Sequence, residues 1–193
     1  MTIQTRRERE RAQREQQIVA AARELAEAEG WEAVTTRRLA AEIEYSQPVL
    51  YSHFKGKGAI MTAVAVQGFE EMADEMRVAR TAARGTRDAL AAVATAYTEF
   101  ARKRPALYDA MFTHAVDLPF ASPETPVHLR NGFDELVQAV QPLAGDEDPG
   151  ILTETFWASL HGLAMLERSG RLPADLHDQR LELLIGRFAP VAT

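Results

Sequence analysis

The chain has 193 residues, 46% of them hydrophobic, and a formal net charge of −6 with no cysteine. This length allows one or two small domains and a sizeable buried core. The lack of cysteine excludes disulfides, thiol redox sensing and thiolate metal sites, and no apolar run is long enough to span a membrane.

The first seventeen residues are dense in charge. They hold the basic residues Arg6, Arg7, Arg9, Arg11 and Arg14 and the acidic residues Glu8, Glu10 and Glu15. This is not a signal-peptide pattern, so we expect a cytoplasmic protein with no membrane partner. We expect the segment to be frayed at its start and helical by its end. Two interpretations stay open: a solvated tail that pairs its own charges, or a basic arm that reaches DNA.

A helix is predicted over residues 16–29, where Ile18, Ala22 and Leu25 share one face. Gly30 ends it, as glycine often does at a helix C-terminus. A small core is expected to form beyond it, from Trp31, Val34, Leu39, Ile43, Leu50 and Phe54.

Residues 35–57 predict two short helices joined by a tight turn. Thr35 or Thr36 can cap the first helix, and Ser46 can cap the second, because their hydroxyls accept orphan backbone N–H bonds. Pro48 fits the first turn of the second helix, where its missing N–H costs little. We expect a buried side of Val49, Leu50 and Phe54, and an outward side of Gln47, Tyr51, Ser52 and His53.

Such a pair of helices has helix-turn-helix geometry, in which the second helix enters the DNA major groove. By geometry alone an ordinary helical hairpin is the alternative. The sequence Ser-Gln-Pro-Val-Leu-Tyr-Ser-His-Phe-Lys-Gly-Lys of residues 46–57 closely resembles the recognition helix of the tetracycline-repressor (TetR) family. The resemblance implies a DNA-binding domain over residues 14–74 and a ligand-binding and dimerisation domain over residues 75–193.

Groove chemistry assigns roles within this motif. The Gln47 amide can hydrogen-bond a base edge, and Pro48 and Val49 can touch a thymine methyl. Phosphate contacts, which position the protein without specifying sequence, are expected from Thr36, Ser46, Tyr51, His53 and Lys57. Arg37 or Arg38, at the start of the first helix, could reach either a base or a phosphate. The predicted DNA-binding set is Thr36, Arg37, Arg38, Ser46, Gln47, Pro48, Val49, Tyr51, Ser52, His53, Lys55 and Lys57. By family resemblance, Gln47, Pro48, Tyr51, His53 and Lys57 match known contact positions best, whereas Gly58 departs from the family pattern.

The rest of the chain is also predicted to be helical. Helices are expected over residues 57–83, from Thr86 through Ala101, from Pro105 through Phe112, over residues 129–140 and 151–169, and from Pro173 onward, with a loop over residues 114–126. No segment predicts a strand with conviction. The fold class is therefore all-α with about nine helices.

Two C-terminal segments, residues 96–108 and 156–163, resemble a TetR subgroup with a Trp-x-x-x-His-Gly signature, here Trp157, His161 and Gly162. Trp157 and His161 are four residues apart and share a helical face, beside a second apolar stripe that includes Phe156 and Leu160. A helix with two such stripes is expected to bury one in its own domain and one against a partner. The resemblance implies a homodimer through the last two helices.

A mostly apolar cavity with a few polar groups is where a small-molecule effector of unknown identity would bind. The candidate lining residues are Tyr97, Phe100, Tyr108, Met111, Phe112, Phe133, Trp157 and His161. Each aromatic residue has core packing as its alternative role, and His161 can equally be a hydrogen-bonded core or interface residue.

No catalytic pattern is present. The five histidines show no H-x-x-x-H spacing for a metal, and the chain lacks a G-x-S-x-G elbow and a phosphate loop. The sequence predicts no enzyme, no catalytic residue, no metal site and no cofactor.

Charge is distributed unevenly along the chain. Residues 1–57 carry 10 basic and 9 acidic side chains, whereas residues 58–193 carry 12 and 19. A nearly neutral head on an acidic body suits a protein that touches phosphate with one end only. We therefore expect a homodimeric repressor that binds a palindromic double-stranded operator and is released by a small molecule. The alternative is an effector-independent helix-turn-helix activator or architectural DNA binder.

Overall fold

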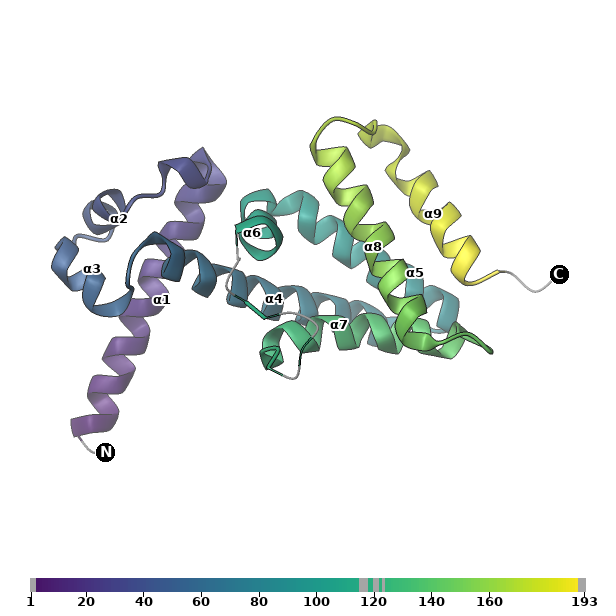
Figure 1. Ribbon diagram of the computed structural model, residues 1–193, viewed down its shortest axis with the longest axis horizontal. Helices are drawn as coiled ribbons and strands as arrows, with labels where there is room; N and C mark the ends of the chain where they lie inside the picture. The colour runs from purple at the N-terminus through teal and green to yellow at the C-terminus, as the bar shows by residue number, and fades with distance from the viewer. Residues whose placement is uncertain (1–2, 115–117, 120–121, 123, 191–193) are drawn as a thin grey trace. The chain divides into compact units, whose positions relative to one another are not determined.

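The computed structural model describes residues 3–114, 118, 119, 122 and 124–190, with side chains from Thr5 onward (Figure 1). Over these residues the chain is almost entirely helical, with nine α-helices and no strand, so the all-α prediction is confirmed. The chain forms two compact units. Unit 1 comprises Met1–Gly68 and Arg104–Pro119, and unit 2 comprises Phe69–Lys103 and Phe120–Thr193.

Unit 1 is built around its first helix. Its elements are α1 (Ile3–Glu29), the 3₁₀ turn η1 (Trp31–Ala33), α2 (Thr36–Glu42), α3 (Gln47–His53), the first part of α4 (Lys57–Ala82), α6 (Pro105–Asp109) and the π-helical turn η2 (Ala110–His114). Helix α1 packs against η1, α2, α3 and α6. The predicted N-terminal segment is thus part of one continuous helix from Ile3, and residues 1–2 lie outside the described part.

The core of unit 1 follows the helical periodicity of α1. Ile18, Ala22 and Leu25 are buried there, together with Trp31, Val34, Leu39, Leu50, Ile60 and Val64 from the elements that follow. Gly30 ends α1 with φ 82°, a left-handed conformation that glycine adopts without a side-chain clash. Ile43 and Phe54, which were expected in this core, are only half-buried, because each lies where a seven-residue helix ends.

Helix α6 is held in unit 1 by two residues of the N-terminal segment. The Glu27 carboxylate accepts hydrogen bonds from the backbone N–H groups of Ala106 (3.1 Å) and Leu107 (2.9 Å), and the Trp31 indole N–H donates to the Ala106 carbonyl oxygen (2.8 Å). Gly68 permits close packing nearby, because a Cβ at this position would lie 2.7 Å from Met111 Sδ. These contacts explain why Arg104–Pro119 belongs to unit 1.

Unit 2 is a helical assembly centred on α5. Its elements are the remainder of α4, α5 (Thr86–Lys103), α7 (Val127–Val140), the 3₁₀ turn η3 (Gln141–Leu143), α8 (Pro149–Arg168), the 3₁₀ turn η4 (Ala174–Leu176) and α9 (His177–Phe188). Helix α5 packs against α7, α8 and α9. Its core side chains are Leu90, Val93, Tyr97 and Phe100 from α5, Leu136 and Val140 from α7, Phe156 and Leu160 from α8, and Leu181 and Ile185 from α9.

The ends of several unit 2 helices lie close to their predicted positions. Asp148 caps α8, because its carboxylate accepts a hydrogen bond from the Ile151 N–H at 2.9 Å. Helix α8 ends one residue before Ser169, and Gly170 follows with φ 68°. The last helix starts later than predicted: Pro173 precedes a 3₁₀ turn, and α9 begins at His177.

Two sequence expectations concern boundaries. The predicted loop over residues 114–126 begins after η2, and its residues 115–117, 120, 121 and 123 lie outside the described part. The first compact unit ends at Gly68 and also includes Arg104–Pro119. This division differs from the predicted domain boundary between residues 74 and 75. The functional domains over 14–74 and 75–193 stay a prediction.

Candidate nucleic-acid interface

The two short helices α2 and α3 are joined by a turn, and residues in and around it set the helix ends. Thr35 precedes α2, and its hydroxyl accepts a hydrogen bond from the Arg38 backbone N–H at 3.2 Å. Glu44 adopts a left-handed conformation, with φ 57°, and so reverses the chain between the helices. Ser46 occupies the N-cap position of α3, but its side chain makes no capping hydrogen bond.

The first turn of α3 presents its side chains to solvent. Leu50 is the residue of α3 that is fully buried, whereas Ser46, Gln47 and Pro48 are exposed. Val49 was expected on the buried side, and that expectation was wrong, because 37% of it is exposed. Val49 lies about 100° around the helix from Leu50, on a side of α3 that is open to solvent. The exposed start of α3 combines one amide with two small apolar groups.

Tyr51 and Ser52 lie on the next part of the same surface. Tyr51 is 52% exposed, and its hydroxyl lies 3.4 Å from the Thr36 hydroxyl at the start of α2. The Ser52 hydroxyl donates to the Val49 carbonyl oxygen at 2.6 Å, within its own helix. The hydroxyl groups of Thr36 in α2 and Tyr51 in α3 therefore lie together.

Arg37 and Arg38 differ in their surroundings. Arg37 is exposed, whereas the Arg38 guanidinium forms a two-pronged ion pair with the Glu29 carboxylate at the end of α1. The hydrogen bond from Arg38 lowers the pKa of Glu29 below its ordinary value, and the same bond raises the pKa of Arg38. Arg37 is thus the more available of the two for a new partner.

Two predicted phosphate contacts are engaged within unit 1. The His53 side chain is only 6% exposed, and its Nδ1 lies 3.3 Å from Glu15 Oε1 of α1. The Lys57 ammonium donates to the backbone carbonyl oxygen of Trp31. Lys55 is exposed. His53 and Lys57 would have to exchange or share these partners in order to hold a phosphate.

The predicted ligand-binding residues fall into both compact units. Tyr108, Met111 and Phe112 belong to unit 1, where the rings of Tyr108 and Phe112 are 4.6 Å apart. The other five belong to unit 2, and Tyr97 and Phe100 are completely buried there.

Four of the unit 2 candidates form a connected group. The Trp157 indole N–H donates to the Tyr97 hydroxyl at 3.0 Å, and the Trp157 ring lies edge-on to Phe133 with centroids 6.2 Å apart. His161 lies 6.5 Å from Trp157 between ring centroids. Burial lowers the pKa of His161 below its ordinary value, and the nearby Arg168 charge lowers it further. This group combines aromatic surface with an imidazole that favours its neutral form.

Two open grooves are lined by residues outside the predicted ligand set. One of about 600 Å³ in unit 1 is lined by Ala20, Arg23, Glu24, Glu27, Ala28 and Gln67. One of about 470 Å³ in unit 2 is lined by Arg87, Gln179, Glu182, Leu183, Gly186 and Arg187.

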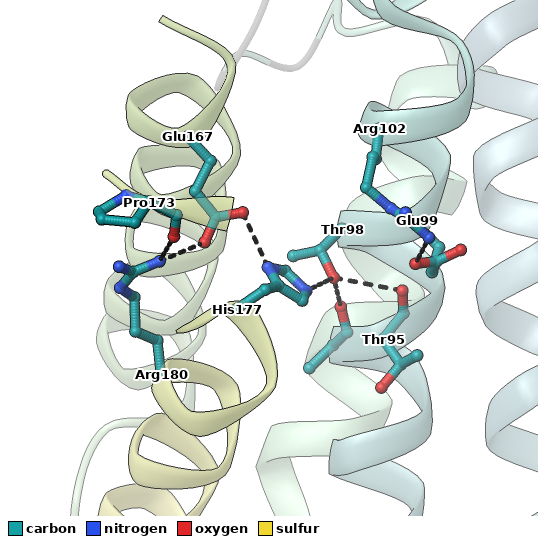
Figure 2. Close-up of polar contacts among 9 residues, drawn as sticks. Thr95, Thr98, Glu99, Arg102, Glu167, Pro173, His177 and Arg180 are labelled. Atoms are coloured by element: carbon teal, nitrogen blue, oxygen red, sulfur yellow. Dashed lines mark hydrogen bonds and ion pairs between the residues drawn. The ribbon is translucent and has the colours of Figure 1, made fainter. Parts of the chain in front are cut away.

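Sequence reasoning missed a polar cluster that joins α5, α8 and α9 (Figure 2). His177 Nδ1 lies 2.8 Å from Glu167 Oε2, and its Nε2 lies 3.2 Å from the Thr98 hydroxyl. Arg180 donates to Glu167 at 2.9 Å and to the Pro173 carbonyl oxygen at 2.6 Å. The spacing of these residues in the sequence does not predict the cluster, because they come from three different helices and meet only in the folded unit.

Within the described part of the chain, no group of three or more histidine and acidic residues could hold a metal ion. Among the same residues, no helix has the length and apolar character needed to cross a membrane.

Two family models match this chain. One, described as bacterial regulatory proteins of the tetR family, matches residues 18–64, and the other, described as a tetracyclin repressor-like C-terminal domain, matches residues 90–188. The first match contains α2 and α3, and the second extends from α5 to the end of α9. The finer Trp-x-x-x-His-Gly subgroup stays a prediction.

Relatives and solved structures agree with these matches. An HTH-type transcriptional regulator from Bacillus subtilis (strain 168), YobS, is 27% identical over 150 residues, which cover 67% of this chain and 78% of that protein. A protein of unknown function from Rhodococcus sp. RHA1 has the same fold, with a TM-score of 0.77, 24% identity and coverage of 90% and 92%. The regulator FadR from Bacillus subtilis, solved in complex with stearoyl-CoA, also shares it, with a TM-score of 0.67, 14% identity and coverage of 92% and 99%.

Proposed function

Because this chain belongs to the TetR family of bacterial regulatory proteins, and is therefore a DNA-binding transcriptional regulator rather than an enzyme, we propose that it is a homodimeric repressor. In this proposal it binds a palindromic operator in the cytoplasm through α3 and is released by a small-molecule effector. The observation that carries the proposal is the exposed first turn of α3, where Gln47, Pro48 and Val49 face solvent on a helix anchored by buried Leu50.

In this proposal the first turn of α3 contacts the bases, and the residues around it contact the phosphates. The Gln47 amide offers both a donor and an acceptor to a base edge, and Pro48 and Val49 offer apolar contact to a thymine methyl. Phosphates would be held around them by the hydroxyl, cationic and imidazole groups of the predicted set. That phosphate-holding set is Thr36, Ser46, Tyr51, His53 and Lys57, and Arg37 or Arg38 would reach either a phosphate or a base edge. Ser52 and Lys55 complete the proposed DNA-binding set.

The dimer is proposed to form through α8 and α9. Both helices carry large apolar side chains that unit 2 does not cover: Ile151 is 67% exposed, and Leu183 is 62% exposed. Leu166 and Leu176 are also exposed near the connection between the helices. A second copy bound through this surface would supply the second α3 helix that a palindromic operator requires.

The effector is proposed to bind the C-terminal domain, in the region of Tyr97, Phe133, Trp157 and His161. These residues combine aromatic surface with a hydrogen-bonded hydroxyl and an imidazole. FadR, a solved structure of the same fold, was determined with a ligand that has a long apolar chain. Helix α4 contributes residues to both units, so it is the proposed route by which ligand binding shifts the population of DNA-competent dimers.

The test begins with selection of duplexes from a random-sequence library by the full-length chain, followed by footprinting at low and near-physiological salt. We expect one palindromic sequence that survives the higher salt. The Gln47→Ala variant should lose about 1–3 kcal/mol at one base step and relax specificity there. Equal weakening on all duplexes would remove Gln47 from base reading, and binding that is uniform and vanishes with salt would mean phosphate contact alone.

The alternative is an effector-independent activator or architectural binder that uses the same helix-turn-helix. A metabolite screen against the selected operator separates the two functions. Release of the operator by one chemical class supports the repressor, whereas constant operator affinity across the screen supports the alternative.

A further inference from the structure

The end of helix α4 buries no side chain. Met76 is the last buried residue of this helix, and the residues from Arg77 to Ala82 are all exposed or half-buried. Within this end of α4, the Arg80 Nε–H donates to Glu135 Oε2 of α7 at 2.8 Å. An ion pair therefore joins the end of α4 to α7 inside unit 2.

The burial of this pair suggests a role other than stability. Among the residues whose side chains the structure describes, Glu135 is the only charged one that is buried, and the Arg80 side chain is only 19% exposed. Removing two charges from water is costly, so an apolar pair of similar size often stabilises a fold at least as well. Losing one partner, however, leaves an uncompensated buried charge. The pair therefore holds α4 and α7 in one register.

A second contact joins the same two helices. His128 Nδ1 of α7 lies 2.5 Å from Glu70 Oε1 of α4. His128 and Glu135 are seven residues apart, so they share one face of α7 and lie about 10 Å apart along it. This face of α7 is thus held against α4 at two points (Figure 1).

The opposite face of α7 meets the proposed effector region. Phe133 lies two residues before Glu135, about 200° around the helix, and its ring packs edge-on against Trp157 of α8 with centroids 6.2 Å apart. Trp157 in turn donates to the Tyr97 hydroxyl. Helix α7 therefore contacts the aromatic group with one face and α4 with the other. Because a helix moves as a rigid element, a ligand that displaces Phe133 also displaces Glu135.

We propose that Arg80 and Glu135 are positioning residues that couple the effector region to operator binding, because their ion pair makes α7 and α4 shift together. The proposal rests on the proposed function, since coupling needs both an operator and an effector. Helix α4 is continuous from Lys57 to Ala82, and its first part belongs to unit 1. Coupling between two binding sites is reciprocal, so operator binding must also change the surroundings of Trp157. This reciprocity permits a test that does not require the effector.

The test uses the two tryptophans of the full-length chain as reporters, labelled with fluorotryptophan and followed by fluorine NMR. Trp31 lies in unit 1, where its carbonyl oxygen accepts a hydrogen bond from Lys57, so its resonance reports operator binding. Trp157 lies in unit 2 and reports the effector region. The probe is the operator duplex selected by the wild-type chain.

Two double variants that leave the net charge unchanged are compared with the wild-type chain. Arg80→Met with Glu135→Leu replaces the ion pair by apolar side chains of similar size, which should keep the chain folded, as circular dichroism checks. The control, Asp74→Ala with Arg77→Ala, removes an exposed ion pair made within α4 and keeps both contacts to α7. Alanine has the highest helix propensity, so the control should keep α4 helical.

We expect the operator to shift both tryptophan resonances in the wild-type chain and in the control. In the Arg80→Met, Glu135→Leu variant it should shift the Trp31 resonance and leave the Trp157 resonance in place. The coupling is overturned if the Trp157 shift persists in this variant, if the control loses it equally, or if the wild-type chain never shows it.

A second variant decides the question if the apolar pair does not fold. Arg80→Lys keeps the charge but loses the planar guanidinium donor, so it should reduce the Trp157 shift. An undiminished shift would contradict the coupling. Failure of the wild-type chain to select any duplex would instead overturn the proposed function.

Discussion

The Glu27 carboxylate of α1 accepts a hydrogen bond from the Leu107 backbone N–H of α6 at 2.9 Å, across 80 residues of sequence. The same carboxylate accepts the Ala106 N–H at 3.1 Å. Two of the orphan N–H groups at the start of α6 are thus satisfied by a side chain from a different helix. This contact anchors the segment Arg104–Pro119 in unit 1.

Glu27→Ala should lower the free energy of unfolding by about 1 kcal/mol, because it removes a capping acceptor from a helix start. The matched control is Glu24→Ala, one turn earlier on α1, which should change stability by less than about 0.5 kcal/mol. Urea unfolding of the three chains provides the comparison. If Glu24→Ala and Glu27→Ala cost the same, the cap at α6 is not the cause.

Glu44 holds a left-handed backbone conformation in the turn between α2 and α3, with φ 57°. A non-glycine residue there costs about 1–2 kcal/mol, whereas glycine adopts the conformation freely but loses more entropy on folding. Glu44→Gly should therefore raise the free energy of unfolding by up to about 1 kcal/mol. Glu42→Gly, at the end of α2, should lower it by about 0.5–1 kcal/mol, and the same sign in both variants would contradict the argument.

The pKa of His161 lies below its ordinary value of 6.5, because burial disfavours the imidazolium and Arg168 repels it. The unfolded chain then binds the proton more readily than the folded chain, so stability is retained above about pH 6.5 and falls as the pH drops toward the folded pKa. Replacing the imidazole by an amide, His161→Gln, should flatten the dependence of unfolding free energy on pH between 7.5 and 5. Parallel curves for the two chains would refute this assignment.

His177 of α9 reaches the Thr98 hydroxyl of α5 at 3.2 Å (Figure 2). A double-mutant cycle of Thr98→Val and His177→Ala should show a coupling of about 0.5–1.5 kcal/mol in the free energy of unfolding, the net contribution of one hydrogen bond. The control cycle combines Thr155→Val with His177→Ala. The Thr155 hydroxyl donates to the Ile151 carbonyl oxygen instead of meeting His177, so this cycle should be additive. Additivity of the Thr98 cycle within about 0.3 kcal/mol would mean that the contact does not stabilise the fold.

Lys57 donates to the Trp31 carbonyl oxygen and is also in the proposed phosphate set. The variant Lys57→Gln keeps an N–H donor for that carbonyl oxygen and loses the charge. It should lower the salt slope of operator binding by about one unit per protomer, with little change in unfolding free energy. An unchanged slope would mean that Lys57 supports the backbone of unit 1 and holds no phosphate.

Much of the local structure was predictable, because it depends on residues close in sequence. The periodicity of Ile18, Ala22 and Leu25 and the glycine at position 30 predicted the end of α1. The helix predicted over residues 151–169 lies within two residues of the observed start of α8 at Pro149. The motif of residues 46–57 led to the family, because its residue types are specific at fixed positions.

Other features were decided only by tertiary structure. The cap that Glu27 provides for α6 and the cluster of His177, Glu167 and Thr98 join residues far apart in the chain, whose approach no helical period encodes. Val49 is partly exposed because α3 packs through Leu50, which lies about 100° away around the helix. The amino-acid sequence by itself determined the helices, the reading motif and the family, because these follow from short-range periodicity, capping and residue type. Which side chains are engaged within the protein and which stay exposed was decided by the packing of helices against one another.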